Sequence, residues 1–215
     1  MPRDFLTVAT PGAGKTTFAL RVATELLTAN RVRRIVIVCP TEHLKSQWAD
    51  AAARVGIHLD PAFANSQVGL GDDFDGLCAT YAQVAMRPAI HRAVVTATPT
   101  LVILDEIHHG GDALSWGEGI ALAYRDAAYR LALTGTPFRS DSAKIPFVRY
   151  REDADGALRS QADYSYGYGQ ALSDGVVRPV LFLSYRGNMR WRTKTGDEFL
   201  VDLAEDASKD VTAKA

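Results

Sequence analysis

Two glycines, a lysine and a pair of threonines stand near the start of the chain at a spacing that suits phosphate binding. The glycines let backbone N–H groups converge on phosphate oxygens without a Cβ atom in the way, and a helix that begins behind them adds its own unpaired N–H groups. The pattern places Lys15 to reach the β- and γ-phosphates of a nucleotide and the Thr16 hydroxyl to ligate Mg²⁺. The predicted nucleotide-binding residues are Thr10, Pro11, Gly12, Ala13, Gly14, Lys15, Thr16 and Thr17.

The segments on either side of this stretch support the same interpretation. An apolar run at 5–9 predicts a strand before it, and a helical pattern opens at Phe18. The general phosphate-loop pattern has glycine five positions before Gly14, where this chain has Ala9. The alternative is a glycine-rich turn with a chance lysine, and that alternative leaves the strand and the helix unexplained.

A second group of chemically capable side chains follows another buried strand. Asp105 and Glu106 come directly after four aliphatic residues. A carboxylate at that strand end can hold Mg²⁺ opposite Thr16, and a second carboxylate beside it can orient or deprotonate an attacking water. The alternative is a polar pair at the point where a strand meets solvent. The phosphate loop earlier in the chain and His108 two residues later argue against this alternative. We expect His109 to be a surface or packing residue.

Size and composition limit the classes of protein that remain. The chain has 215 residues, 47% of them hydrophobic and 23% charged, with a net charge of −1. These values fit an ordinary globular α/β domain with additional segments, and any nucleic-acid contact must come from a local patch. The two cysteines, Cys39 and Cys78, lack metal-ligand spacing and are expected to be buried and reduced. The N-terminal residues do not resemble a signal peptide, and no apolar run approaches the ~20 residues of a membrane span. We therefore expect a cytoplasmic protein.

Strand and helix patterns alternate through the first 140 residues. Apolar runs at 5–9, 35–38, 101–104 and 129–134 predict buried strands with helices between them, a pattern typical of a mostly parallel sheet with helices on both faces. Ligands bind such sheets at the carboxyl ends of the strands, where the motifs above lie. The helix after the phosphate loop is expected to bury Phe18, Val22, Leu26 and Ala29, and the next helix, with Thr41 as its N-cap, to carry Leu44, Trp48, Ala52 and Val55.

The pattern changes after about residue 140. Residues 141–160 are polar and mixed, and an aromatic, glycine-rich stretch at 164–169 leads into a short helix near Ala171. Residues 176–185 predict a strand, with Pro179 favouring an edge position. The basic stretch 186–194 is interpreted as a solvated linker, with nucleic-acid binding by Arg186, Arg190, Arg192 and Lys194 as the alternative. The acidic tail from Asp197 is expected to be weakly helical.

Several motifs together resemble superfamily 2 helicases and translocases of the DEAH-like type. They are 10–17 as motif I, 105–108 as motif II and 133–139 as motif III, in the order and spacing of that family. The chain is most similar to the branch that contains restriction-enzyme motor subunits, in which Ala9 is the usual residue. Residues 38–41 with Leu44, Gln47 and Trp48 look like motif Ia, and 80–83 look like a later strand-contacting motif.

The resemblance implies a RecA-like lobe that uses ATP and Mg²⁺ and contacts nucleic acid. It implies that Asp105 completes the metal site and that Glu106 is the catalytic base. It implies that His108, Thr134, Gly135 and Thr136 couple the nucleotide site to the nucleic-acid face. Hydroxyls, amides and helix N-termini suit contacts to phosphates. The residues expected to contact one strand of DNA, or of RNA, are Pro40, Thr41, Gln47, Thr80 and Tyr81. Arg139 is expected to face either a phosphate or an acidic neighbour.

The resemblance covers one lobe of a two-lobe motor. Family members use arginines of a second RecA-like lobe to stabilise the transferring phosphoryl group, and we find no such lobe here, nor a glutamine-bearing adenine-contacting segment before the phosphate loop. We predict an ATP-binding lobe at 1–140, an extension packed on it at 141–195, and a linker toward an absent second lobe at 196–215. Two alternatives stay open: a stand-alone phosphate-loop NTPase or kinase, and an ATP-gated binding module without turnover.

Overall fold

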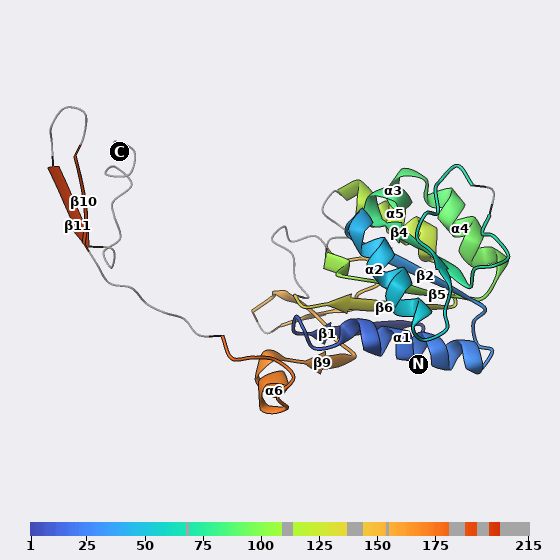
Figure 1. Cartoon of the computed structure of the whole chain (residues 1–215), viewed down its shortest axis with the longest axis horizontal. Coiled ribbons are helices and arrows are strands. Elements are labelled where there is room, and N and C mark those ends of the chain that lie inside the picture. Colours follow the sequence, from blue (N-terminus) through green and yellow to red (C-terminus); the bar gives the residue numbers. More distant parts are fainter. Residues whose placement is uncertain are drawn as a thin grey trace. The chain divides into compact units, whose positions relative to one another are not determined.

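A parallel sheet covered by helices forms the core of residues 1–178 in the computed structural model (Figure 1). The chain divides into two compact units, Met1–Arg178 and Pro179–Ala215, and each is described by itself. None of the described helices combines the length and apolar character that crossing a membrane requires. The structure describes residues 1–67, 69–108, 114–136, 144–153, 155–180, 188–192 and 198–202.

The first unit contains a seven-stranded sheet in which every neighbouring pair is parallel. Its strands are β1 (Asp4–Ala9), β2 (Arg34–Cys39), β3 (Leu59–Asp60), β4 (Gly76–Thr80), β5 (Thr100–Leu104), β6 (Tyr129–Thr134) and β9 (Tyr164–Tyr166). They lie in the order β3-β4-β2-β5-β6-β1-β9. The helices of this unit are α1 (Lys15–Thr28), α2 (Glu42–Ala53), α3 (Tyr81–Met86), α4 (Pro88–Ala97), α5 (Leu114–Tyr124) and α6 (Tyr168–Ser173). This confirms the predicted α/β fold.

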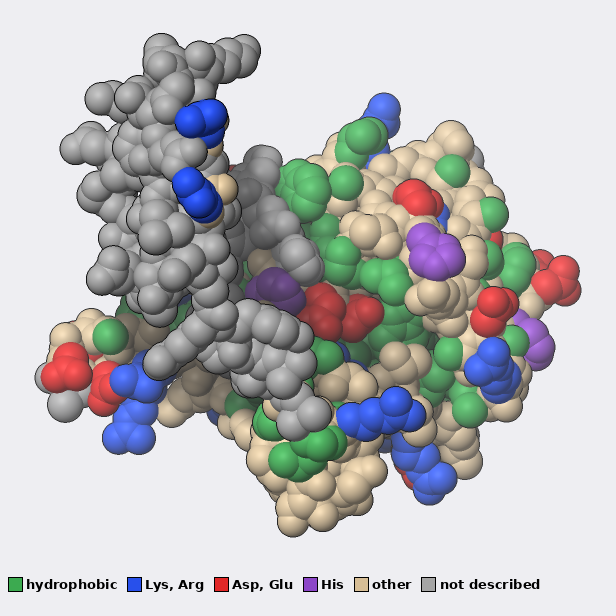
Figure 2. Space-filling view, turned by 60° about the vertical axis from the view of Figure 1, so that its left-hand side comes forward, with side chains coloured by type: hydrophobic (Ala, Val, Ile, Leu, Met, Phe, Trp, Pro, Cys, Tyr) green, Lys and Arg blue, Asp and Glu red, His purple; other side chains and the backbone are tan. Residues whose placement is uncertain are grey.

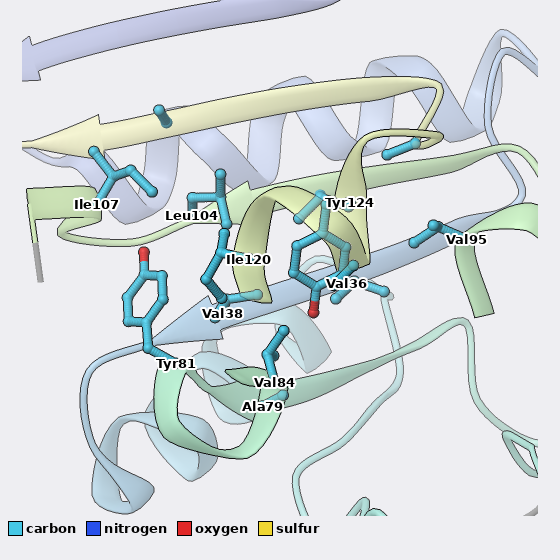
Figure 3. Packing of buried hydrophobic residues seen from close by; sticks show 14 of the residues in the cluster. Val36, Val38, Ala79, Tyr81, Val84, Val95, Leu104, Ile107, Ile120 and Tyr124 are labelled. Carbon is cyan, nitrogen blue, oxygen red and sulfur yellow. The ribbon is translucent and has the colours of Figure 1, made fainter. Parts of the chain in front are cut away.

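The central strands bury both of their faces, as the continuous aliphatic runs predict. In β2, Val36 and Val38 join one hydrophobic cluster, while Ile35 and Ile37 join a second cluster on the opposite face. Figure 3 shows the first cluster, in which side chains of α3 and α5 pack against β2 and β5. The second cluster contains residues of α1 and α2. Helices therefore cover both faces of the sheet.

The packed face of α1 includes three of the predicted residues, Phe18, Val22 and Leu26, which are partly buried against the second cluster, but it is centred on their neighbours. Its fully buried residues are Ala19, Leu20 and Ala23, whereas Phe18 is only partly buried and Ala29 is exposed. Small side chains at i and i+4 allow a helix to approach the sheet closely, so the larger apolar side chains lie at the margins of the contact.

Helix α2 agrees better with the sequence pattern. Trp48 and Ala52 are buried, which confirms core packing for the tryptophan. Thr41 occupies the N-cap position with extended backbone angles, but its side chain makes no capping hydrogen bond. Val55 lies beyond the end of the helix and is exposed, so its predicted place on the buried face was wrong.

The segments after residue 140 differ most from the prediction. An antiparallel hairpin, β7 (Tyr150–Glu152) with β8 (Leu158–Ser160), lies within 141–160, the stretch described from the sequence as polar and mixed. Both strands are largely exposed, so they lack the apolar alternation that marks a strand. Residues 176–180 form no strand, contrary to the prediction for 176–185, and residues 181–185 lie outside the described part.

The second unit contains an antiparallel pair, β10 (Asn188–Arg192) and β11 (Glu198–Asp202). The weakly helical prediction for the tail was therefore wrong at 198–202. The residues there are Glu-Phe-Leu-Val-Asp, and their aromatic and β-branched members favour a strand once a partner strand is present.

Candidate nucleotide and nucleic-acid site

The phosphate-loop residues connect the end of β1 to the start of α1. Gly12 and Gly14 have positive φ angles of 79° and 83°, a backbone conformation that side chains with a Cβ atom rarely adopt. Gly14 is the N-cap of α1, and no side chain caps it. The first N–H groups of the helix are thus left for another acceptor, such as a phosphate oxygen.

The lysine of this loop contacts the predicted base. Lys15 Nζ lies 3.0 Å from Glu106 Oε1 and donates a hydrogen bond to the Ala9 carbonyl oxygen at 3.2 Å. The structure therefore brings the phosphate loop to the turn after β5, through two residues, Lys15 and Glu106, that are 91 positions apart in the chain. Lys15 and Glu106 form an ion pair, and an anionic ligand could take the place of the Glu106 carboxylate beside the Lys15 ammonium group.

Glu106 itself has a φ of 47°, in the left-handed region that is uncommon for residues other than glycine. Holding such a residue there costs on the order of 1–3 kcal/mol, and these conformations concentrate at active sites. The Gly135 N–H donates to Glu106 Oε2 at 3.3 Å, and His108 Nδ1 lies 3.5 Å from the same oxygen. The carboxylate is thus held from three sides while remaining partly exposed.

Asp105 is held by two elements that sequence reasoning connected with nucleic acid. Trp48 of α2 donates its indole N–H to Asp105 Oδ2 at 2.8 Å. Tyr81 of α3 donates its hydroxyl to the Asp105 carbonyl oxygen, also at 2.8 Å. Burial raises the pKa of the Asp105 carboxyl and the Glu106 charge adds to the rise, while the Trp48 hydrogen bond and Lys15 oppose it. The two hydrogen bonds link α2 and α3 directly to the predicted metal ligand.

Three of the four predicted coupling residues, His108, Thr134 and Thr136, form one hydrogen-bonded group, and the fourth, Gly135, donates to Glu106. The Thr134 hydroxyl donates to the Thr136 carbonyl oxygen at 3.0 Å and accepts from the Thr136 N–H at 3.1 Å. His108 Nδ1 lies 2.9 Å from the same hydroxyl. Because the hydroxyl proton goes to Thr136, the imidazole is the donor in this pair. Thr134 is fully buried, so the turn after β6 is fixed to motif II.

The residues expected to contact nucleic acid fall into two groups. Thr41 and Gln47 are exposed and Pro40 is half-buried, so all three present surface to a ligand. Thr80 is 6% exposed and its hydroxyl accepts from the Gln83 N–H as a helix cap. Tyr81 has no exposed surface.

A side chain with no exposed surface cannot contact a nucleic-acid strand in this conformation. We therefore replace the surface role expected of Tyr81 with its observed contact to Asp105. Among the described residues on the face in view, Figure 2 shows acidic and basic side chains scattered among apolar ones. The pattern agrees with the sequence argument that any nucleic-acid contact is local.

Some site predictions lie outside the described residues. They are His109 and the residues of motif III after Thr136, namely Pro137, Phe138 and Arg139. Among the described residues no group of three or more His, Cys, Asp and Glu side chains could hold a metal ion. The donors on hand, the Asp105 carboxylate and the Thr16 hydroxyl, instead match the way Mg²⁺ binds through one or two protein oxygens and the phosphates of a substrate.

Sequence reasoning missed two features of this region. It assigned Trp48 to the core without its hydrogen bond to Asp105, because spacing along a helix does not reveal which strand end the helix crosses. It also missed β9, which pairs with β1 beside the phosphate loop. The tyrosines of β9 were visible as an aromatic stretch, but three residues are too few to show a strand period.

Comparison with known proteins is consistent with this arrangement. The family model described as "Type III restriction enzyme, res subunit" matches residues 2–139. Uncharacterized proteins of Mycobacterium tuberculosis and Mycobacterium leprae are 59% and 56% identical to the whole chain. The chain spans 36% of the length of these curated relatives.

Two solved structures share the fold at low identity. The SWI2/SNF2 ATPase core of Sulfolobus solfataricus in complex with double-stranded DNA has a TM-score of 0.53 and 20% identity over 64% of this chain and 29% of its own. A nuclease-deletion mutant of the Type ISP restriction-modification enzyme LlaGI, in complex with a DNA substrate mimic, has a TM-score of 0.54 and 14% identity over 81% of this chain and 19% of its own.

Proposed function

Because the chain belongs to the family of Type III restriction enzyme res subunits, we propose that it is the ATP-binding lobe of a DNA-dependent ATPase motor. The observation that carries the proposal is the contact of Lys15 with Glu106, which joins the phosphate loop to motif II, together with the link from Glu106 to the turn after β6. A structural glycine-rich turn would not require these three segments to meet.

Each side chain would have a distinct task. Lys15 and the N–H groups of α1 would hold the phosphates of ATP. Thr16 and Asp105 would hold Mg²⁺, which when bound neutralises phosphate charge. Glu106 would orient the attacking water and take its proton. Its partner contacts from Gly135 and His108 would set its direction.

The same contacts suggest how nucleic acid would influence hydrolysis. Helix α2 presents Thr41 and Gln47 at its surface and Trp48 to Asp105. A strand bound at the first two would shift the helix, and the indole hydrogen bond would carry that shift to the metal ligand. DNA is favoured over RNA because the family is a restriction-enzyme subunit and because both structural relatives described above were solved with DNA.

Hydrolysis is expected to need a second lobe. An arginine supplied from outside the phosphate-binding domain accelerates phosphoryl transfer by roughly 10³ to 10⁵. We propose that this arginine comes from the part of the longer relatives that the chain does not span. The chain by itself would then bind ATP and turn it over slowly or not at all.

The test is nucleotide binding by calorimetry and steady-state ATPase activity with and without single- and double-stranded DNA. Lys15→Ala is expected to weaken binding of ATP by more than about tenfold, since it removes the cation that faces the phosphates. Glu106→Gln is expected to keep binding and to abolish any residual turnover, and the exposed Glu25→Gln is the matched control. Binding that does not depend on Lys15 would refute the proposal.

The remaining outcomes separate the alternatives. Strong DNA-stimulated turnover by the chain alone, lost in Glu106→Gln, would mean that the site is completed within the chain or by self-association. Strong turnover without DNA would favour a stand-alone NTPase. Binding of ATP and DNA without turnover, even after addition of the remaining part of a longer relative, would favour a binding module.

A further inference from the structure

A pocket of about 220 Å³ lies beside the phosphate loop, next to β9. This volume is several times the ~30 Å³ that one water occupies in the liquid, so the pocket can admit a group of many atoms. Ala13, Gly14 and Lys15 belong both to the pocket wall and to the loop. A ligand that binds the loop through its phosphates would therefore extend into the pocket. The remaining wall is formed by Thr7, Ala9, Phe18, Tyr164, Tyr166 and Val176.

Strand β9 brings its tyrosines to this place by pairing with β1. In the parallel register Thr7 lies opposite Tyr164 and Ala9 opposite Tyr166. The pairing continues into the loop, because the Thr10 N–H donates to the Tyr166 carbonyl oxygen at 3.1 Å. The pocket and the loop are thus parts of one hydrogen-bonded framework.

Aromatic rings line this pocket. Phe18 of α1 and Tyr164 of β9 are stacked, with ring centroids 6.2 Å apart and planes at 20°. Tyr164 is 46% exposed, so its ring is accessible to a ligand. Tyr166 donates its hydroxyl to Asp174 Oδ2 at 2.8 Å, which fixes the direction of its ring. Flat apolar walls that stay partly open suit a flat aromatic ligand.

One polar atom in the pocket wall has no partner. Thr7 is 2% exposed, and its hydroxyl makes no hydrogen bond with any described residue. Buried hydroxyl groups are nearly always hydrogen-bonded, so an orphan of this kind needs an explanation. A heteroaromatic ring, with nitrogen atoms and exocyclic groups at its edge, would supply the missing partner.

We propose that this pocket receives the base of the nucleotide whose phosphates bind residues 10–17. The base would stack on the rings of Phe18, Tyr164 and Tyr166, and its edge would hydrogen-bond to the Thr7 hydroxyl. The inference rests on the proposed nucleotide site and extends it to recognition of the base. It assigns recognition of the base to β9, which follows the predicted motifs at 10–139 in the chain.

The experiment compares calorimetric binding of ADP with that of inorganic tripolyphosphate, which has no base. Tyr164→Ala is expected to weaken ADP binding about tenfold, the usual scale of one base–aromatic stack, and to leave tripolyphosphate binding unchanged. Thr7→Val keeps the shape and removes the hydroxyl, and it is expected to weaken ADP binding by roughly threefold or more. Tyr164→Phe should retain the wild-type affinity for ADP.

The matched control is Tyr168→Ala, which removes a similarly exposed tyrosine that does not line the pocket. Unchanged ADP binding in both Tyr164→Ala and Thr7→Val would overturn the inference. An equal loss of ADP and tripolyphosphate binding would also overturn it, because the role of these residues would then be structural. Failure of the wild-type chain to bind tripolyphosphate would refute the phosphate-loop function instead, so the two failures are distinguishable.

Discussion

The two sides of the phosphate loop differ in the kind of side chain that forms them. Toward β5 and β6, polar groups hold one another: Lys15 contacts Glu106, Glu106 contacts Gly135, and Thr134 is bonded to its neighbours. Toward β9, the surface is aromatic and partly open, and the buried Thr7 hydroxyl has no partner among the described residues. The side chains of the first side are held by contacts within the protein, whereas the second side contains a buried hydroxyl group without a partner among the described residues, which our proposal assigns to a ligand.

This difference shows which parts of a site are preorganised. Groups that act on charge that develops during a reaction are effective when their direction is fixed beforehand. Groups that recognise a flat ligand need only present a surface and one unsatisfied donor or acceptor. Each side contains one buried threonine, Thr134 on the polar side and Thr7 on the aromatic side, and the two lie on adjacent strands. Replacement of each by valine tests how the two sides differ.

The largest expected effect on the free energy of unfolding comes from a change of pH. It therefore determines the pH at which the two threonine variants should be compared. His91 is 1% exposed, its Nε2 lies 3.0 Å from Asn65 Oδ1, and burial lowers its pKa from 6.5 to about 4. The unfolded chain takes up this proton near pH 6.5 and the folded chain only near pH 4, so stability is lost as the pH falls through that window. The 2.5-unit difference, 6.5 minus 4, corresponds to roughly 3 kcal/mol.

Urea unfolding at pH 7.5, 5.5 and 4.5 would measure this loss. His91→Gln is the control, since it should lower stability at neutral pH and flatten the dependence between pH 6.5 and 4. An equal slope in the two proteins would mean that His91 is not the group responsible. The comparison of the two sides of the loop is therefore to be made at pH 7.5.

The next largest effect is expected for Thr134→Val. The substitution leaves the Thr136 N–H and the His108 ring without their buried acceptor. Because Thr136 is exposed and His108 only partly buried, water can replace part of the lost contacts, and the free energy of unfolding should fall by about 1 kcal/mol. Urea unfolding with an unchanged m-value would check this, and a change below about 0.5 kcal/mol would show that the polar side is less tightly held than its geometry indicates.

The smallest effect is expected for Thr7→Val. The hydroxyl makes no hydrogen bond within the described residues, so its replacement by a methyl group removes no contact and relieves a desolvated polar atom. The free energy of unfolding should stay within about 0.5 kcal/mol of the wild type or rise slightly. A loss as large as that of Thr134→Val would mean that the two sides do not differ as proposed.

The polar side is the part of the site that the sequence predicts well. Lys15, Asp105, Glu106 and Thr134 each follow a local signal, namely a glycine-rich turn for Lys15, a four-residue aliphatic run for Asp105 and Glu106, and the strand pattern at 129–134 for Thr134. Parallel strands place such ends at one edge of a sheet, so the contacts between them follow from the fold class. The structure brings these residues together, and their individual roles remain predictions.

The aromatic side could not be predicted in the same way. Strand β9 has three residues and lies at the sheet edge, and its position depends on pairing with a strand more than 150 residues earlier in the chain. Local propensity carries no information about such a distant partner. Tyr81 differs from its expectation too, since the family resemblance implied a contact with nucleic acid but the hydroxyl donates to the Asp105 carbonyl oxygen.

The indole of Trp48 gives this site a built-in optical signal. The chain has three tryptophans, and this one is 3% exposed with its N–H on the Asp105 carboxylate. The emission of a buried indole responds to charge placed at its hydrogen-bonding edge. Occupation of the site by a cation or a nucleotide would therefore change the intrinsic fluorescence of the protein, without any label and at a position that the solvent does not reach.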